Sequence, residues 1–251
     1  MASAGIGDSL EGLHAVRAAV DAGRVTSILV ERSRTRRDDY RTLLDDAAGR
    51  RVRIEQVDDV RDHAASGAPQ GIVAKARPIP YSSLDAAIAV SDPPALLVVD
   101  HLEDPRNVGA IARSMVAAGV RSLVIPERRS APLGATAFKA AVGAFEKLTV
   151  VQTKSTADAM RRLRKAGVWL VGLDAGGDRS LFGCDLLDQP VAIIVGAEGK
   201  GLSHLASDLL DVTVTIPIAP DVESLNASVA ASLAVFEVSR MRGATLDGPL
   251  A

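Results

Sequence analysis

Three segments of the chain carry polar side chains and glycines at spacings that could do chemistry. An arginine six residues after an asparagine could clamp or stabilise an anion, and a glutamate among glycines could fix a guanidinium group. Taken one at a time, the same residues could instead cap helices or turn the chain. The segments span residues 100–113, 195–203 and 216–230, and their candidate residues are Asn107, Arg113, Glu198, Ser224 and Asn226.

The glycine-rich segment does not match two familiar nucleotide sites. Gly196, Gly199 and Gly201 lack the G-x-G-x-x-G spacing of a dinucleotide site, and Gly199-Lys200 lacks the spacing and the Ser/Thr of a P-loop. The four histidines have no i,i+4 pairing and no cysteine partner, so we expect no metal site. No serine lies in a Gly-x-Ser-x-Gly elbow. The sequence therefore argues against an ordinary NTPase and a standard dinucleotide enzyme.

The composition is that of a globular protein. Of 251 residues, 47% are hydrophobic, and the net charge of −2 excludes a globally basic nucleic-acid binder but not a local basic face. Aromatic residues make up only 3%, which argues against recognition by many stacked aromatic side chains. The single cysteine, Cys184, cannot form an internal disulfide, which predicts a reducing cytoplasm. No apolar run approaches the roughly 20 residues of a membrane span, and residues 1–8 lack the features of a signal peptide.

The polar segments lie beside apolar runs that alternate with helical patterns. The runs lack period-two alternation, which predicts strands buried on both faces of a parallel sheet. Ligands of such sheets bind beyond the carboxyl ends of the strands, so the segments that follow the strands are the candidate site. The expected strands are Ala95–Val99, Ser122–Ile125, Val168–Leu173, Val191–Val195 and Val212–Ile216, and the expected helices are Val108–Ala118, Ala135–Val142, Thr156–Ala166, Leu202–Leu209 and Ala227–Met241.

A smaller α/β unit precedes this region. Two proline clusters, at residues 77–80 and 92–94, argue against regular structure there and mark a linker with one short helix, Ser82–Ala89. We predict a first domain of residues 1–77, a linker of residues 78–94 and a second domain of residues 95–251. The elements expected in the first domain are helices His14–Ala22, Asp38–Ala48 and Asp58–Ala65 and strands Ser27–Val30, Val52–Val57 and Gly71–Ala76.

Together, the three polar segments resemble the three motifs of the SPOUT superfamily, in its TrmH/SpoU branch of RNA ribose 2′-O-methyltransferases. The first motif is matched by residues 104–113 (DPRNVGAIAR) and the second by residues 195–201 (VGAEGKG). The third is matched by residues 216–230 (IPIAPDVESLNASVA). The order and rough spacing of all three fit the family, so the joint match is strong where each part is weak.

The first domain resembles the substrate-binding domain of the bacterial 23S rRNA guanosine 2′-O-methyltransferases of this family. The resemblance rests on residues 11–16 (EGLHAV) and 70–74 (QGIVA), and with the motifs it covers nearly the whole chain. Pro69 departs from the pattern, which more often has histidine before Gln70. This departure concerns RNA binding and leaves the methyl-transfer segments untouched.

The resemblance implies a fold, a cofactor and an assembly. The fold is an α/β methyltransferase domain with a C-terminal trefoil knot, and the cofactor is S-adenosyl-L-methionine, held mostly by backbone groups that glycines let it approach closely. The assembly is a homodimer through residues 227–241, with each site completed by the second subunit. The composition and the histidine pattern add the expectations of a cytoplasmic protein with no membrane and no metal partner. The implied cofactor positions are Gly196, Ile216, Leu225, Leu173 and Gly201, and the implied catalytic residues are Arg113, Asn107, Glu198, Ser224 and Asn226.

The role of Arg113 and the identity of the RNA stay open at this point. Arginine holds its proton strongly and is a reluctant base, so Arg113 could instead clamp a phosphate beside the target ribose or stabilise the developing alkoxide. A guanosine of 23S rRNA is the expected substrate; a tRNA, or an rRNA site that confers antibiotic resistance, is the alternative, as is an inactive RNA-binding or assembly protein. A metabolic enzyme using another nucleotide is disfavoured by the lack of a standard nucleotide motif. Further RNA contacts are expected from a basic cluster, Arg32, Arg34, Arg36 and Arg37.

Overall fold

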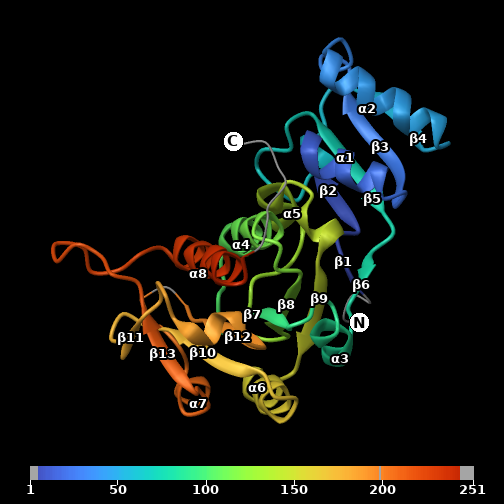
Figure 1. Cartoon of the computed structure of the whole chain (residues 1–251). Helices are drawn as coiled ribbons and strands as arrows, with labels where there is room; N and C mark the ends of the chain where they lie inside the picture. Colours follow the sequence, from blue (N-terminus) through green and yellow to red (C-terminus); the bar gives the residue numbers. More distant parts are fainter. Residues whose placement is uncertain (1–4, 198, 244–251) are drawn as a thin grey trace.

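A computed structural model describes residues 5–197 and 199–243 of the chain, and Figure 1 shows its two α/β units. The larger unit is built on a sheet of seven strands, all parallel, in the order β11-β13-β10-β12-β7-β8-β9. The predicted α/β class with a parallel sheet is confirmed. The strands are β7 (Ala95–Val99), β8 (Ser122–Pro126), β9 (Thr149–Thr153), β10 (Trp169–Leu173), β11 (Arg179–Ser180), β12 (Val191–Val195) and β13 (Val212–Thr215).

Helices cover both faces of this sheet. Successive residues of a strand point to opposite faces, and in β7 Leu97 and Val99 join one hydrophobic cluster while Leu96 and Val98 join another. Burial on both faces explains why the strands read as continuous apolar runs. The first cluster includes residues of α4 (Pro105–Ala117), α5 (Ala135–Ala141) and α8 (Ala227–Met241), and the second includes residues of α3 (Leu84–Ile88), α6 (Thr156–Lys165) and α7 (His204–Ser207).

Two strands of the large sheet, β9 and β11, are absent from the sequence-based prediction. Both lie at edges of the sheet, and only Val150 and Val151 of β9 are buried, while β11 is exposed. An edge strand is not covered on all sides, so it needs no long apolar run and leaves a weak signal in the sequence. The five predicted strands are all present, with bounds that differ by at most one residue.

The smaller unit contains a four-stranded sheet in the order β2-β5-β3-β4, in which β5 runs antiparallel to both neighbours. The helix expected at residues 58–65 is wrong, because only a short 3-10 turn, η1 (Arg61–His63), forms there. The buried carboxylate of Glu11 accepts hydrogen bonds from the backbone N–H groups of Ala65 and Ser66, which holds this segment as a loop. The other elements are β2 (Ser9–Glu11), α1 (Leu13–Asp21), β3 (Val25–Glu31), α2 (Asp38–Gly49), β4 (Arg53–Val57) and β5 (Ile72–Ala76).

The segment between the two units is held at both ends. The short strand β6 (Ile79–Pro80) pairs antiparallel with β1 (Gly5–Ile6), and α3 packs into the second cluster of the large sheet. The expectation that the first proline cluster lies outside regular structure is therefore wrong for β6. Proline has no backbone N–H to donate to a neighbouring strand, and a two-residue strand at an edge does not need that hydrogen bond.

The small unit packs directly on α5 and on the 3-10 turn η2 (Ala144–Lys147) that follows it. Nε of Arg24 donates to Oε2 of Glu146 at 2.8 Å, a second bond joins the same two groups, and their side chains are only 12% and 8% exposed. A Cβ on Gly7 would lie 2.3 Å from the ring of Phe138, so backbone and aromatic ring are in close contact. Buried side chains of both units belong to one hydrophobic cluster, and the two units form one packed body.

Candidate active site

The strand order brings the three polar segments to one edge of the large sheet. Strands β13, β10, β12 and β7 are parallel neighbours, so their carboxyl ends lie side by side. Residues 100–113 follow β7, residues 195–203 begin at the end of β12, and residues 216–230 follow β13. Leu173, one of the expected cofactor positions, ends β10 among them and is buried.

The glycines after β12 close a tight loop. The backbones of Ala197 and Gly201 exchange two hydrogen bonds, of 3.0 and 2.9 Å, and Gly199 and Gly201 have φ angles of +73° and +64° that favour glycine. A Cβ on Gly196 would lie 2.2 Å from the carbonyl of Gly201. The missing side chain of Gly196 therefore makes room for the loop itself, and the approach of a ligand to this position stays a prediction. Glu198, at the tip, lies outside the described residues.

A buried carboxylate that sequence reasoning missed joins the first segment to the second. Asp100, directly after β7, accepts a hydrogen bond on Oδ2 from the backbone N–H of Ser203 at 2.8 Å. Its Oδ1 lies 3.4 Å from Nδ1 of His101, whose φ of +60° is unusual for a residue other than glycine. A carboxylate placed immediately after a fully apolar strand is the sequence signal that could have pointed to Asp100.

The starts of α4 and α8 meet through two asparagines. Nδ2 of Asn226 donates to Oδ1 of Asn107 at 3.1 Å. Asn226 also caps α8, because its Oδ1 accepts hydrogen bonds from the backbone N–H groups of Ser228 and Val229. Further along, the hydroxyls of Ser232 and Ser114 lie 2.7 Å apart, so the two helices run side by side in the same direction. The structure thus brings together two of the predicted site residues from the first and third segments.

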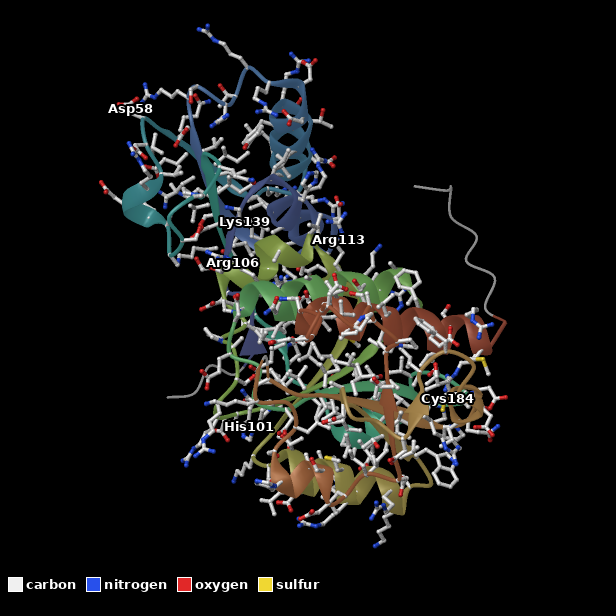
Figure 2. The ribbon with its side chains drawn as sticks, turned by 90° about the vertical axis from the view of Figure 1, so that its left-hand side faces the viewer. Asp58, His101, Arg106, Arg113, Lys139 and Cys184 are labelled. Carbon is white, nitrogen blue, oxygen red and sulfur yellow. The ribbon has the colours of Figure 1, made fainter. Side chains whose placement is uncertain are left out.

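Arg113 lies farther along α4 than the sequence suggests. The helix begins at Pro105, capped by Asp104, and not at Val108, so Arg113 is about 12 Å along the axis from the first helical residue. Its side chain is exposed on the same face of α4 as Arg106, and no described residue gives its guanidinium a hydrogen bond or an ion pair. Figure 2 shows Arg106, Arg113 and Lys139 beside the small unit. The structure therefore does not bring Arg113 into contact with Asn107 or Asn226.

The third segment is the most exposed of the three. Ile216 is half-buried against the core, Ser224 is exposed, and Leu225 is half-buried just before α8. Residues 216–219 belong to neither helix nor strand, so their backbone groups lie outside the sheet. The exposed apolar side chains of Ile218 and Val222 on this segment leave a surface that a ligand or another chain could cover.

Over the residues that the structure describes, no three histidine, cysteine or acidic side chains come together as a metal site. Within the same residues, no helix has the length and apolar character needed to cross a membrane.

Family comparisons identify both units of the chain. Residues 94–236 match the model of the SpoU rRNA methylase family, and residues 9–82 match a model for RNA 2′-O ribose methyltransferase substrate binding. The chain belongs to the SpoU rRNA methylase family. This membership confirms the resemblance that the three motifs and the first domain indicate.

Several SpoU relatives are similar over nearly the whole chain. The 23S rRNA (guanosine-2′-O-)-methyltransferase RlmB of Shewanella oneidensis is 36% identical over 94% of this chain and 98% of its own length. A Synechocystis protein described as an uncharacterized tRNA/rRNA methyltransferase is 37% identical, and this chain spans 63% of its length. The SpoU methyltransferase AviRb of Streptomyces viridochromogenes, solved in complex with AdoMet, has a TM-score of 0.77 and 28% identity, covering 94% of this chain and 91% of AviRb.

Proposed function

We propose that this chain transfers a methyl group from S-adenosyl-L-methionine to a ribose 2′-hydroxyl of RNA, and that the substrate is a guanosine of 23S rRNA. The observation that carries the proposal is the meeting of the three motif segments at one sheet edge, where Asn107 of the first is hydrogen-bonded to Asn226 of the third. The similarity to RlmB over most of both chains supports the reaction and the substrate. The AdoMet complex of AviRb supports the cofactor.

The loops after β10, β12 and β13 fit this cofactor. Backbone groups of residues 216–219 lie outside the sheet and can bind an adenine edge or a methionine moiety. Leu173 at the end of β10 and Ile216 just after neighbouring β13 supply apolar side chains there. When bound, S-adenosyl-L-methionine supplies a sulfonium methyl group open to attack by an oxygen nucleophile. The residues proposed to hold it are Leu173, Gly196, Gly201, Ile216 and Leu225.

The chain's own residues orient and polarise the reacting ribose. Asn107 and Asn226 are positioning residues, because their hydrogen bond fixes the start of α4 against the start of α8. Arg113 either holds a phosphate beside the target ribose or stabilises charge that develops on the 2′-oxygen. Glu198 and Ser224 complete the proposed catalytic set, Glu198 by fixing the guanidinium and Ser224 by orienting the third segment.

We propose that the working form is a homodimer built on the α4–α8 layer. Val229 and Phe236 lie seven residues apart on α8 and are 46% and 43% exposed, which is unusual for large apolar side chains on one helix face. Arg113 is exposed on α4, which packs beside α8, and no residue of its own described chain pairs with it. A second copy that covers this layer would bury the apolar side chains and supply loops that reach Arg113. Phe236→Asp should therefore give monomers in analytical ultracentrifugation and lose methyl transfer.

The division of labour follows the two units. We propose that residues 1–77 bind RNA, residues 78–94 connect, and residues 95–251 carry the methyl-transfer reaction. An RNA substrate and a single buried cysteine, Cys184, support work in a reducing cytoplasm. The knotted chain path that the family resemblance implies is part of the same proposal.

A direct assay tests the function. The full chain is incubated with methyl-labelled S-adenosyl-L-methionine and either total rRNA or total tRNA, and ribose methylation is mapped. Labelled 2′-O-methylguanosine in 23S rRNA is the expected product. Methylation confined to tRNA would show that tRNA, and not 23S rRNA, is the substrate. A folded protein that binds neither the cofactor nor its demethylated product would refute the proposal.

A further inference from the structure

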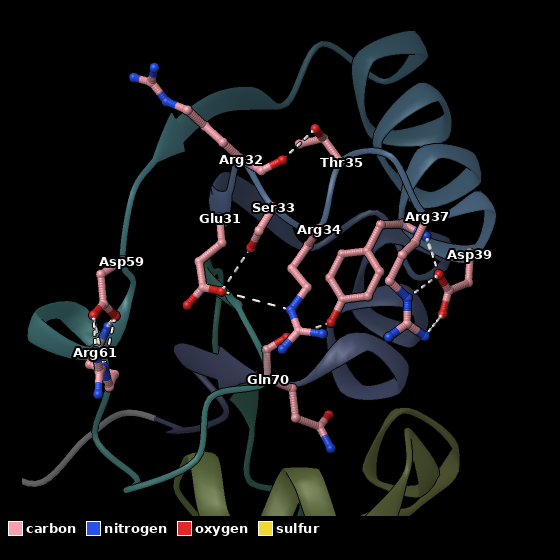
Figure 3. Close-up of polar contacts among 11 residues, drawn as sticks. Glu31, Arg32, Ser33, Arg34, Thr35, Arg37, Asp39, Asp59, Arg61 and Gln70 are labelled. Carbon is pink, nitrogen blue, oxygen red and sulfur yellow. Dashed lines mark hydrogen bonds and ion pairs between the residues drawn. The ribbon is translucent and has the colours of Figure 1, made fainter.

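A polar hollow of about 340 Å³ lies in the small unit, at the start of α2 and beside the first turn of α1. Figure 3 shows Gln70 and Arg34 on one side of it and Arg37 with Asp39 on the other. The methyl-transfer segments do not contribute to it. It is lined by Leu13, His14, Arg34, Arg37, Asp39, Tyr40 and Gln70.

Gln70 is held in a strained backbone conformation at this hollow. Its φ of +61° is in the left-handed region, which residues other than glycine seldom adopt. The buried hydroxyl of Tyr40 donates a hydrogen bond to the carbonyl of Gln70 and keeps the backbone in this state. Strain of this kind persists where surrounding contacts enforce it and is concentrated at functional positions. The observed strain therefore points to a function for the Gln70 side chain.

Two glycines make room for the polar groups of the hollow. A Cβ on Gly12 would lie 2.7 Å from Oε1 of Gln70, and a Cβ on Gly71 would lie 2.6 Å from Cγ of Arg34 and 2.9 Å from its Nε. Both glycines have positive φ, a backbone conformation that strains a residue with a side chain. The two glycines thus leave the space that the Gln70 amide and the Arg34 side chain occupy.

The Glu11 side chain holds the loop that precedes Gln70 in place. The Glu11 carboxylate is fully buried and accepts hydrogen bonds from the backbone N–H of Ser66 at 3.0 Å, from that of Ala65, and from the Ser66 hydroxyl. Lys139 of α5 donates to the carbonyl of Ala68 in the same loop. Glu11 and Gly12 begin one of the two sequence stretches that mark this domain, and Gln70 and Gly71 begin the other, so both stretches lie at or beside the hollow.

The charges around the hollow are already paired. Arg37 bonds to Asp39 at 2.7 Å, and this bond lowers the pKa of Asp39, so both groups are charged at neutral pH. Arg34 lies 3.7 Å from Glu31, and its buried Nε makes no hydrogen bond to any described residue. With two cations beside two anions, the hollow does not attract a phosphate strongly. It offers donors and acceptors together, which suits a neutral group with a mixed hydrogen-bonding edge.

A nucleobase is such a group. Unpaired bases in RNA are recognised through hydrogen bonds to their edges and by stacking on aromatic rings or guanidinium planes. The guanidinium of Arg37 already lies over the ring of Tyr40, 5.3 Å from its centre, and forms a flat platform at the mouth of the hollow.

We propose that this hollow binds one unpaired nucleotide of the RNA substrate, with the Gln70 amide and the Arg34 guanidinium bonded to the edge of its base and Arg37 stacked on its face. The proposal rests on the proposed RNA methyl transfer and adds a base-recognition site outside the methyl-transfer segments. The site lies beside α5, and Arg106 and Arg113 lie on neighbouring α4, so an RNA held here runs toward the arginine of the first motif.

Gln70→Gly is the decisive variant, because glycine suits the backbone angle at this position and the substitution removes the side chain while keeping the carbonyl that Tyr40 bonds. Binding of the full chain to a short fluorescein-labelled RNA of mixed sequence is followed by anisotropy, with the RNA single-stranded or paired into a duplex. Gln70→Gly should weaken single-strand binding by about three- to tenfold, the effect of one or two lost hydrogen bonds, and should leave the salt dependence unchanged. Duplex binding should change less.

Substitutions of two similarly paired arginines distinguish an effect of the hollow on RNA binding from an effect of general surface charge. Arg37 and Arg61 are each paired to an aspartate two residues away, but only Arg37 lines the hollow. Arg37→Gln should weaken single-strand binding several-fold more than Arg61→Gln. Equal effects of the two, or wild-type affinity in Gln70→Gly, would overturn the base site. A wild-type chain that binds S-adenosyl-L-methionine but no RNA at all would instead contradict the proposed function itself.

Discussion

The contact between Asn107 and Asn226 allows stability and positioning to be separated. Asn226→Ser retains an oxygen that caps α8 but is too short to reach Asn107, so it should lose one hydrogen bond, worth about 1 kcal/mol of unfolding free energy. Asn226→Ala also loses the cap, which adds about 1 kcal/mol. For a chain of 251 residues we expect the Tm to fall by about 2–4 °C for the first variant and about twice that for the second.

The loss of catalytic activity in the two Asn226 variants should not follow their loss of stability. Both variants remove the amide that holds the first segment against the third, and a misplacement of about 1 Å can cost roughly a hundredfold in rate, so kcat should fall by similar large factors in both. Single-turnover methyl transfer and urea unfolding measure the two effects. Ser232→Ala, which breaks a separate hydrogen bond between the same helices, is the control and should lose stability while keeping kcat. A normal kcat in Asn226→Ser, or a loss of kcat that follows stability across all three variants, would refute the positioning role.

Four further changes probe other parts of the molecule. Arg113→Ala should slow methyl transfer by about a hundred- to thousandfold. Arg113→Lys should lose most of the activity because lysine lacks the planar fork, and calorimetry should show intact cofactor binding in both variants. Gly196→Val should abolish cofactor binding because its side chain would displace the backbone of Gly201, whereas Gly49→Ala, where space is open, should bind normally. Glu146→Gln should cost about 3 kcal/mol in urea unfolding, because it leaves Arg24 nearly buried without its charge partner. Replacing the four arginines of the basic cluster, Arg32, Arg34, Arg36 and Arg37, with alanine should flatten the salt dependence of RNA binding only slightly, because three of them form ion pairs within the chain. A large decrease in the salt dependence would contradict this expectation.

The architecture of the large unit could be predicted because its signals are local. Apolar runs such as Ala95–Val99 and Val191–Val195 are buried on both faces, so their composition alone identifies them as strands. The insertion of β12 between β10 and β7, which brings the polar segments together, follows from pairing between distant residues and leaves no periodic trace. The resemblance to a family supplied that information in its place.

Several local errors have a common origin in side chains that act at a distance. The start of α4 was signalled by Asp104-Pro105, a capping residue followed by proline. Asn107 also resembles a cap, but its side chain accepts a hydrogen bond from Asn226, 119 residues away. The loop at residues 58–65 reads as a helix because the carboxylate that prevents it belongs to Glu11. The hollow at Gln70 depends on Gly12 in the same way. Such contacts become visible only once the chain is folded.

The packed junction between the two units fixes the distance between the hollow at Gln70 and Arg113. Because Arg24, Glu146 and Phe138 hold the small unit on α5 and η2, this packing sets the separation between Gln70 and Arg113. A flexible tether would let a bound RNA present many riboses in turn and would lower the effective concentration of each at the methyl donor. With a fixed separation, the loss of positional freedom occurs during folding and not during RNA binding. If the hollow holds a base as proposed, the target ribose is selected by its distance along the RNA, and inserting one nucleotide between the held base and the methylated ribose should move or abolish the modification.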